Sequence, residues 1–191
     1  MRFPRTLATV ATALALTLTG CSGADSSSGE GFNDADVDFA SDMIQHHAQA
    51  LVMVDLTMGR ELDPEVAALT EEIRAAQAPE IETMADWLEE WDEPVPETSR
   101  DHVNAHGDGG EMDTDMPGMM SAEDMAALEE APEGEFQDMW LEMMIDHHEG
   151  AVEMAEGQVE NGEDEQAVAL AKEIIAAQQA EIMAMQDLLG G

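Results

Sequence analysis

The chain has 191 residues, of which 44 are acidic and only 6 are lysine or arginine, giving a formal net charge of −38 at pH 7. This length suits one ordinary domain, or two small halves that share a core. The negative charge makes nucleic acids and anionic membrane surfaces poor partners. It leaves two interpretations of the surface: a field that concentrates cations, or the solvated coat of an exported or salt-adapted protein.

The first 20 residues have the features of a secretory signal peptide. Two arginines precede an apolar run over residues 7–18, which is too short to cross a membrane in the mature protein. The sequence Leu-Thr-Gly-Cys at 18–21 resembles the bacterial lipobox, so we expect cleavage before Cys21 and lipidation of its thiol. Residues 21–32 are rich in Ser, Gly and acidic side chains, which predicts a flexible tether. We therefore expect an exported domain, anchored by lipid on the outer face of the bacterial cell membrane.

Two helices are expected in the first half of the domain. Residues 34 to about 58 repeat apolar side chains at helical spacing, with Asn33 as the expected N-cap and Gly59 as the expected end. The second helix is expected from Pro64 to about residue 90, and Pro79 is expected to kink it or to free one carbonyl. The predicted buried face of the first helix consists of Val37, Ala40, Met43, Ile44, Leu51, Val54 and Met58.

A long crossover over residues 91–132 separates this half from the next. Pro and Gly interrupt the helical pattern there until Ser121, which begins a capping box and predicts a short helix to about residue 130. Two further helices are expected over about 133–161 and 164–189, and no segment alternates like a strand.

The second half repeats the first. Residues 43–88 and 144–189 share 19 identities in 46 positions without a gap, at an offset of 101 residues. We therefore predict an all-α, four-helix bundle over residues 33–191, built from two duplicated helical hairpins and having pseudo-twofold symmetry. The halves are expected at about 33–90 and 133–191.

Each half carries one His-His pair, and its two members point in different directions on a helical wheel. The second histidine lies at the centre of the apolar face, whereas the first lies about 100° away, at the flank. Neighbouring helical residues do not face each other, so a pair is not expected to chelate one ion, but a methionine three or four residues earlier can share an ion with either histidine. The residues concerned are Met43, His46 and His47, and Met144, His147 and His148.

The second and fourth helices place polar residues inside their apolar stripes. Gln77 and Glu80 occupy such positions, as do Gln178 and Glu181. A buried carboxylate needs a partner, a proton or a metal ion. Two interpretations stay open: a transition-metal site made of imidazole, carboxylate and thioether groups, and a packed core of hydrogen-bonded His–Glu pairs. In the first, Glu80 and Glu181 are ligands, or acceptors that orient the imidazoles.

The crossover combines Met and His with an acidic, Pro- and Gly-rich composition. Methionines in such a segment are not explained as core; thioethers favour Cu(I) and imidazole suits Cu(II). In an oxidising exterior, with no cysteine besides a lipidated one, these are the ligands left for copper. The alternative is an acidic loop with incidental methionines. The candidate ligands here are His102, His106, Met112, Met116, Met119 and Met120.

Together these motifs resemble the domain-of-unknown-function family numbered 305. The resemblance rests on the two Met-Ile-x-His-His-x-x-Ala-x-x-Met segments, on Met-Pro-Gly-Met-Met in the crossover and on two Ile-x-x-Ala-Gln-x-x-Glu-Ile segments, and covers residues 34–189. Family members have a ferritin-like helical bundle, and some are exported copper-binding proteins, so the resemblance implies the same here. It implies metal-binding roles for Met43, His46, His47, Met53, Met144, His147, His148 and Met154.

We therefore predict a lipid-anchored protein that binds copper for sequestration or handover, rather than an enzyme. Two alternatives stay open: a metal-dependent oxidoreductase, and a structural or interaction module with a His–Glu polar core. The expected partners are a metal ion and, through the anchor only, a membrane; nucleic acid is not expected. The sequence leaves open the native metal, the accepting protein and whether the chain forms a homodimer.

Overall fold

The computed structural model describes residues 31–98 and 116–190, and all regular structure in these ranges is helical. The all-α prediction is therefore confirmed. No helix within these ranges is long and apolar enough to span a membrane. The helices are α1 (Asp34–Asp55), α2 (Pro64–Glu90), α4 (Ala122–Glu130), α5 (Glu133–Asn161) and α6 (Glu165–Gly190). The predicted signal peptide, Cys21, His102, His106 and Met112 lie outside the described residues.

Helix ends follow the capping chemistry of the sequence. The Asn33 side chain accepts hydrogen bonds from the first turn of α1, and Ser121 does the same for α4, each within a capping box. The predicted end of the first helix was wrong by about one turn, because α1 ends at Asp55 and the chain turns away towards Gly59, at φ +85°. Met58 therefore leaves the predicted buried face and is 72 % exposed.

Pro79 lies inside α2 without ending it. A proline in a helix frees the carbonyl four residues earlier, here that of Ala75. Both Ala75 and Pro79 are exposed, so water can hydrate that carbonyl. The Thr83 hydroxyl donates to the Pro79 carbonyl at 2.9 Å one turn later. The expected interruption therefore has little consequence on this face.

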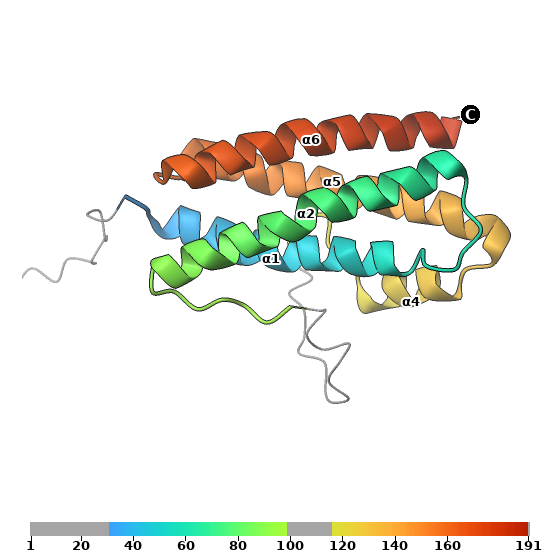
Figure 1. Ribbon diagram of the computed structural model, residues 1–191, viewed down its shortest axis with the longest axis horizontal. Coiled ribbons are helices and arrows are strands. Elements are labelled where there is room, and N and C mark those ends of the chain that lie inside the picture. The colour runs from blue at the N-terminus through green and yellow to red at the C-terminus, as the bar shows by residue number, and fades with distance from the viewer. Residues whose placement is uncertain (1–30, 99–115, 191) are drawn as a thin grey trace, which may run out of the picture.

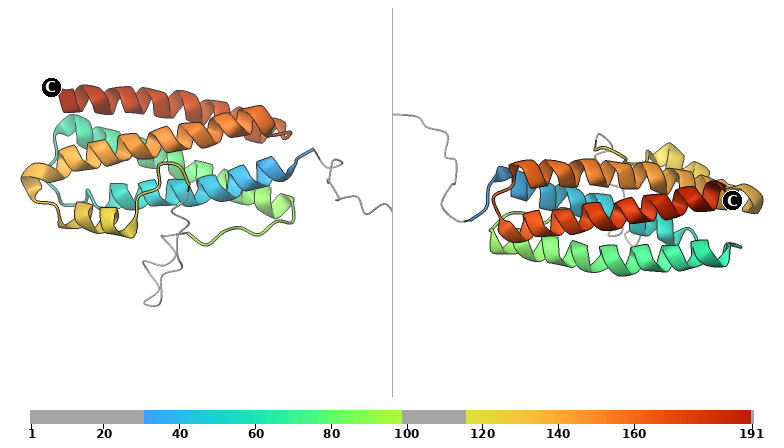
Figure 2. Two further views of the ribbon diagram at one scale, coloured as in Figure 1. Left: turned by 180° about the vertical axis from the view of Figure 1, so that it is seen from behind. Right: turned by 90° about the horizontal axis from the view of Figure 1, so that it is seen from above.

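Two helical hairpins build the bundle, as Figures 1 and 2 show. α1 packs along α2 and α5 packs along α6, and the two hairpins meet mainly through α1 and α5, which run antiparallel. The apolar core is divided into two clusters, one towards each end of the bundle. Met53 and Trp140 belong to one, and Met43 and Phe39 to the other.

Hydrogen bonds at repeat-related positions tie each hairpin to the other. Buried Asp36 on α1 accepts from the backbone N–H groups of Glu163 and Asp164 in the α5–α6 turn, at 3.0 and 3.1 Å. Gln137, 101 residues after Asp36, accepts from the backbone N–H of Asp63 in the α1–α2 turn at 2.7 Å. The first helix of each half thus holds the turn of the other half.

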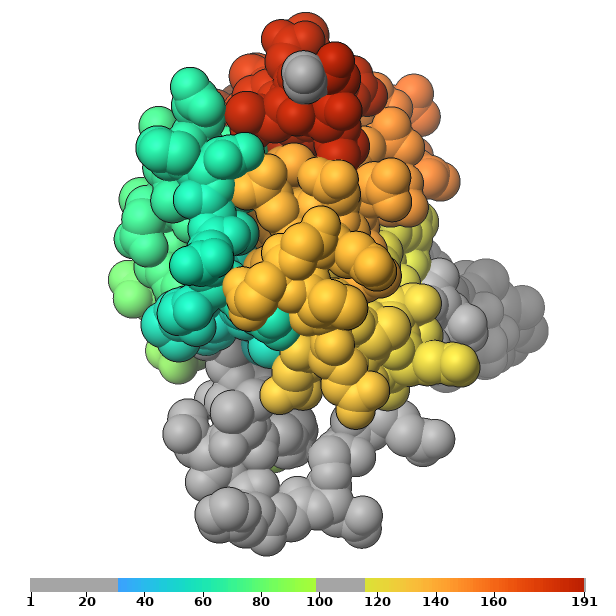
Figure 3. All heavy atoms as spheres, turned by 90° about the vertical axis from the view of Figure 1, so that its right-hand side faces the viewer, coloured from blue at the N-terminus to red at the C-terminus, as the bar shows by residue number. Residues whose placement is uncertain are grey.

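The short helix α4 packs beside the start of α5, at one end of the bundle (Figure 3). Its Leu128 is fully buried in the same apolar cluster as Phe136 and Trp140. Arg60 holds its C-terminal end, donating to the carbonyls of Glu129 and Ala131 at 2.5 and 3.0 Å. The crossover therefore contributes to the core at this end.

Replacing Asp36 by alanine should strongly destabilise the bundle. Its carboxylate also accepts from the Asn33 N–H and the Gln158 amide, so the change leaves four donors without an acceptor. We expect a loss of about 3 to 5 kcal/mol in the free energy of unfolding, measured by urea denaturation. Asp86→Ala, at an exposed position of α2, is the control and should change stability by less than about 0.5 kcal/mol. Equal effects of the two changes would contradict a stabilising role for the Asp36 hydrogen bonds to the α5–α6 turn.

Candidate functional site

The two His-His pairs lie at the middle of the contact between α1 and α5. The imidazole rings of His46 and His147 are packed against each other, with 3.8 Å between centroids and an interplanar angle of 46°. These two residues are repeat counterparts, and counterparts that touch lie on the pseudo-twofold axis. The wheel placed them at a flank, but His46 is 0 % and His147 1 % exposed. That flank is buried because it faces the opposite hairpin.

Most of the polar atoms of this ring pair have no hydrogen-bond partner. His46 Nδ1 and both ring nitrogens of His147 are buried without one, and only His46 Nε2 is engaged, by the Pro117 carbonyl at 3.0 Å. A carbonyl only accepts, so His46 donates from Nε2 and, in its neutral form, has its lone pair on Nδ1. Buried polar atoms are usually paired, so this arrangement indicates a ligand site.

Both imidazoles of this ring pair are held neutral. Burial lowers the pKa of His46 from 6.5 to about 3, and the adjacent His47 acts in the same direction. Burial likewise lowers the pKa of His147 well below 6.5, reinforced by His46 and His148. A contact of the His147 ring with the His46 backbone carbonyl acts in the opposite sense, but it does not have the geometry of a hydrogen bond, so both ring nitrogens stay without a full partner. Neutral imidazole is the form that binds transition metals.

The second histidine of each pair points into its own hairpin. His47 Nε2 lies 2.7 Å from Glu80 Oε2, and His148 Nε2 lies 2.8 Å from Glu181 Oε2. The sequence predicted that these glutamates meet these histidines, and their geometry agrees. Each carboxylate orients its imidazole and leaves Nδ1 without a partner.

Gln77 and Gln178 share the buried layer with these His–Glu pairs. They are 2 % and 3 % exposed, and three of their four side-chain polar atoms have no partner. The predicted inward polar set is therefore buried as expected. It is not fully satisfied by hydrogen bonds, which argues against a closed His–Glu polar core.

A segment of the crossover, Met116 to Met120, lies over the ring pair, and we call it the strap. Gln49 on α1 holds it with two hydrogen bonds to the backbone of Met120, at 2.7 and 2.8 Å. On α5 the strap lies against Gly150, where a Cβ atom would collide with the Pro117 carbonyl. Gly118 has φ +74°, and a Cβ there would lie 2.7 Å from the Asp146 carbonyl. Close packing thus brings the Pro117 carbonyl to His46.

The remaining predicted ligands occupy different environments. Met43, Met53 and Met144 are fully buried, whereas the three strap methionines are partly buried. Met154 is partly buried and lines a surface pocket further along α5. Within residues 31–98 and 116–190, no three His, Cys, Asp or Glu side chains come close enough together to hold a metal ion. A site with three or more side-chain ligands in this part of the chain therefore has to include thioether or amide groups.

Sequence reasoning missed three residues that shape this site: Gln49, Pro117 and Gly150. One signal was available, because Gln49 and Gly150 are repeat counterparts that differ between the halves. The difference marks where a single asymmetric segment crosses both helices, with a side chain to bind it on one helix and space for it on the other. The contact with Pro117 had no signal of its own.

Comparison with known proteins gives a family and several related structures. A family model described as "Domain of unknown function (DUF305)" matches residues 36–189. A DUF305 fragment from Deinococcus radiodurans is 28 % identical, with a TM-score of 0.71 over 84 % of this chain and 99 % of that one. A DUF305 protein from Streptomyces coelicolor is 33 % identical, with a TM-score of 0.69 over 82 % and 91 %.

A third related structure carries a metal. CopM in its Cu(II)-bound form is 29 % identical, with a TM-score of 0.65 over 81 % of this chain and 95 % of that one. CopM has also been solved with Cu(I), with silver and in the apo form. No curated protein matches the chain.

Replacing His147 by leucine should not destabilise the metal-free protein. The change removes two buried nitrogens that have no partner, so we expect the free energy of unfolding to stay equal or rise by about 1 kcal/mol. His148→Leu, one position later, removes the partner of Glu181 and should cost about 2 kcal/mol. Denaturant unfolding in the presence of a chelator measures both. A large loss for His147→Leu would mean that the pair is a structural network.

The metal-free protein should also lose stability in acid through this pair. Below about pH 6.5 the unfolded chain binds a proton at His147 that the folded chain, with its lowered pKa, does not bind. Stability therefore falls as the pH falls, by up to about 1.4 kcal/mol per pH unit for one histidine. In His147→Leu, the free energy of unfolding should therefore fall less steeply between pH 6.5 and 5 than in the wild type, as measured by denaturant unfolding. Both proteins carry the same acidic surface, which therefore contributes equally to the two curves of unfolding free energy against pH. Parallel curves would contradict the lowered pKa of His147.

Proposed function

The chain belongs to the DUF305 family, and from this premise we propose that it is an exported, lipid-anchored protein that binds copper ions for sequestration or handover. The observation that carries the proposal is the contact between His46 and His147, in which three of four ring nitrogens are buried without a partner. CopM, a relative of similar fold, has been solved with Cu(I), Cu(II) and silver. The Streptomyces relative is described as a secreted protein, which supports export.

The site binds through side chains that the fold has already oriented. His46 offers Nδ1, because its Nε2–H is held by the Pro117 carbonyl. His147 can offer either ring nitrogen. Because these imidazoles are already neutral at neutral pH, they can bind copper without first losing a proton. The sequence places the second histidine of each pair at the centre of the apolar face, but we assign the central ligand position to the first, since Glu80 and Glu181 already engage the second.

Soft ligands are expected to complete the site. Met43 and Met144 stand one turn before the histidines on their helices, and both are fully buried. Met116 and Met119 belong to the strap, beside the Pro117 carbonyl that bonds to His46. Thioethers favour Cu(I) and imidazoles accept both copper ions. A mixed set can therefore retain copper in either oxidation state.

The His–Glu pairs have a supporting role in this proposal. A carboxylate that accepts from one imidazole nitrogen fixes the orientation of the ring. Glu80 and Glu181 do this at 2.7 and 2.8 Å for His47 and His148, whose Nδ1 atoms are buried and unpartnered. We propose these as a second pair of interior ligand positions. His102, His106 and Met112 of the crossover remain proposed capture residues.

Copper titration of purified protein tests the central site. Under a Cu(I) buffer and separately with Cu(II), His46→Ala with His147→Ala should lose one bound ion per chain, or bind it at least about 100-fold more weakly. In the wild type the same ion should raise the unfolding free energy by about 2.7 kcal/mol when present at 100 times its dissociation constant. Elemental analysis and thermal unfolding measure the two effects.

Two further experiments distinguish the central site from the crossover, and a copper-binding protein from an oxidoreductase. His102→Ala with His106→Ala and Met112→Leu should remove copper captured by the crossover while leaving the central ion. Unchanged copper binding in the double histidine variant would exclude the central site. Sustained turnover of an electron donor and O₂ by the copper-loaded protein would favour the oxidoreductase instead.

A further inference from the structure

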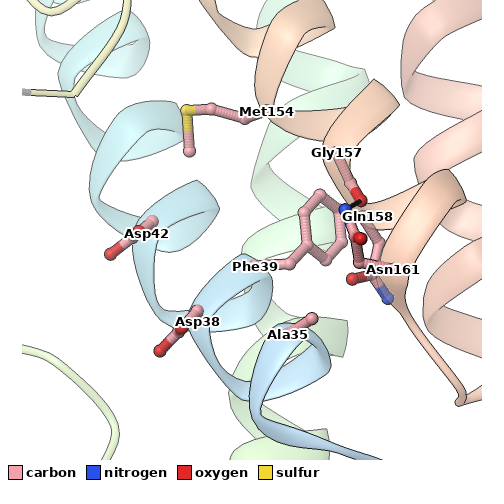
Figure 4. A pocket seen from close by; sticks show the side chains of 8 residues that line it. All are labelled: Ala35, Asp38, Phe39, Asp42, Met154, Gly157, Gln158 and Asn161. Carbon is pink, nitrogen blue, oxygen red and sulfur yellow. Dashed lines mark hydrogen bonds between the residues drawn. The ribbon is translucent and has the colours of Figure 1, made fainter.

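Among the residues that the structure describes, the groove between α1 and α5 is covered at one end of the bundle and open at the other. At the covered end, α4 packs beside the start of α5. At the other end lies a pocket of about 240 Å³, shown in Figure 4. We call it the open pocket, and its lining residues are Ala35, Asp38, Phe39, Asp42, Met154, Gly157, Gln158 and Asn161.

The open pocket has an apolar floor and an acidic rim. Phe39 is 5 % exposed and forms the floor with the partly buried Met154. Asp38 is exposed on α1, and Asp34, one turn earlier on the same helix, is exposed as well. None of the eight lining residues is basic. The pocket therefore offers an apolar contact with negative charge along its α1 side.

The covered end is the repeat counterpart of this pocket. Phe136, Met139 and Met143 on α5 stand 101 residues after Ala35, Asp38 and Asp42. Phe136 belongs to the apolar cluster that also contains Leu128 of α4, and Met139 and Met143 pack against that cluster. At these three positions the groove carries large apolar side chains where α4 covers it, and small or acidic ones at the end that no described segment covers.

Arg60 and Asn161 are a further pair of repeat counterparts at the two ends of the groove. Arg60 donates to two carbonyls at the C-terminal end of α4, and its counterpart is Asn161 at the edge of the open pocket. The Asn161 side chain accordingly lies where the end of a second short helix would come. Leu128 and Met125, three residues apart, are the side chains that α4 directs to the cluster.

We propose that the open pocket binds a short amphipathic helix of a partner protein, with apolar residues three apart and lysine or arginine beside them. The position follows from the cover that α4 provides at the counterpart, and the basic character from the acidic rim. This binding surface is separate from the central histidines and does not depend on copper.

A second copy of this chain is a poor occupant. Its α4 carries Glu123, Asp124, Glu129 and Glu130, so it would bring four negative charges to the rim that Asp38 belongs to. Like charges placed together disfavour such a complex. Charge complementarity therefore selects a different, basic helix.

A designed peptide tests this surface on the full chain. The probe is a stapled nine-residue helix with the α4 sequence, in which all four acidic residues are replaced by lysine; the staple is needed because so short a helix is marginal alone. We expect one peptide to bind per chain at physiological salt, measured by calorimetry. A scrambled peptide of the same composition should bind at least tenfold more weakly, since general attraction to an acidic protein does not depend on sequence order.

Pocket variants decide whether the binding is specific. Gly157→Leu fills the open pocket, and a Cβ there meets no atom within 4 Å, so the fold should be kept. We expect it to weaken binding at least tenfold, whereas Gly134→Leu, an equally open position on α5, should leave binding unchanged. Asp38→Lys should also weaken it, against Asp187→Lys on α6 as control.

Three outcomes would overturn the proposal. The first is equal binding of the designed and scrambled peptides. The second is full binding by Gly157→Leu. The third is a dimer in sedimentation that Gly157→Leu abolishes, because the pocket would then belong to an interface between copies of the chain.

Discussion

The crossing of α1 and α5 is the contact on which the rest of the structure depends. The two hairpins meet mainly through these helices, and at the middle of the crossing His46 lies against its own repeat counterpart. A contact of this kind places polar rings where a bundle ordinarily has aliphatic side chains. The surrounding layer of His–Glu pairs and buried glutamines keeps that polar character across the bundle. Stability must therefore come from the two apolar clusters on either side, and from ties such as those of Asp36 and Gln137.

Local chemistry predicted most of the fold. The capping residues Asn33 and Ser121, and the repeat itself, were sufficient for helix positions and for the all-α class. Met58 was misplaced because a helical wheel continues past the residue where the chain turns. His46 was misplaced for another reason: a wheel describes one helix, and a flank becomes interior only when a second hairpin covers it. His47 with Glu80 was predictable, since both residues lie on apolar stripes of one hairpin.

Asymmetry in an otherwise repeated chain comes from the crossover. It supplies α4 to one end of the α1–α5 groove and the strap to its middle, whereas no described part of it covers the open pocket at the other end. Each of these differences has a counterpart in the sequence: Gln49 against Gly150, Arg60 against Asn161, and Met139 against Asp38. Positions at which two repeats disagree are therefore informative, because they locate the surfaces that a single unrepeated segment touches.

The hydrogen bond from His46 to the Pro117 carbonyl has a consequence for the ring pair as a whole. Duplication made the two imidazoles identical in sequence, but the strap fixes the tautomer of one and leaves the other free to protonate either nitrogen. The pair thus combines one imidazole with a fixed tautomer, His46, and one whose tautomer can change, His147. Copper changes its preferred arrangement of ligands when it changes oxidation state. In the proposed copper site, a single imidazole that can change its tautomer would let the ligands follow that change while the backbone of the bundle stays still.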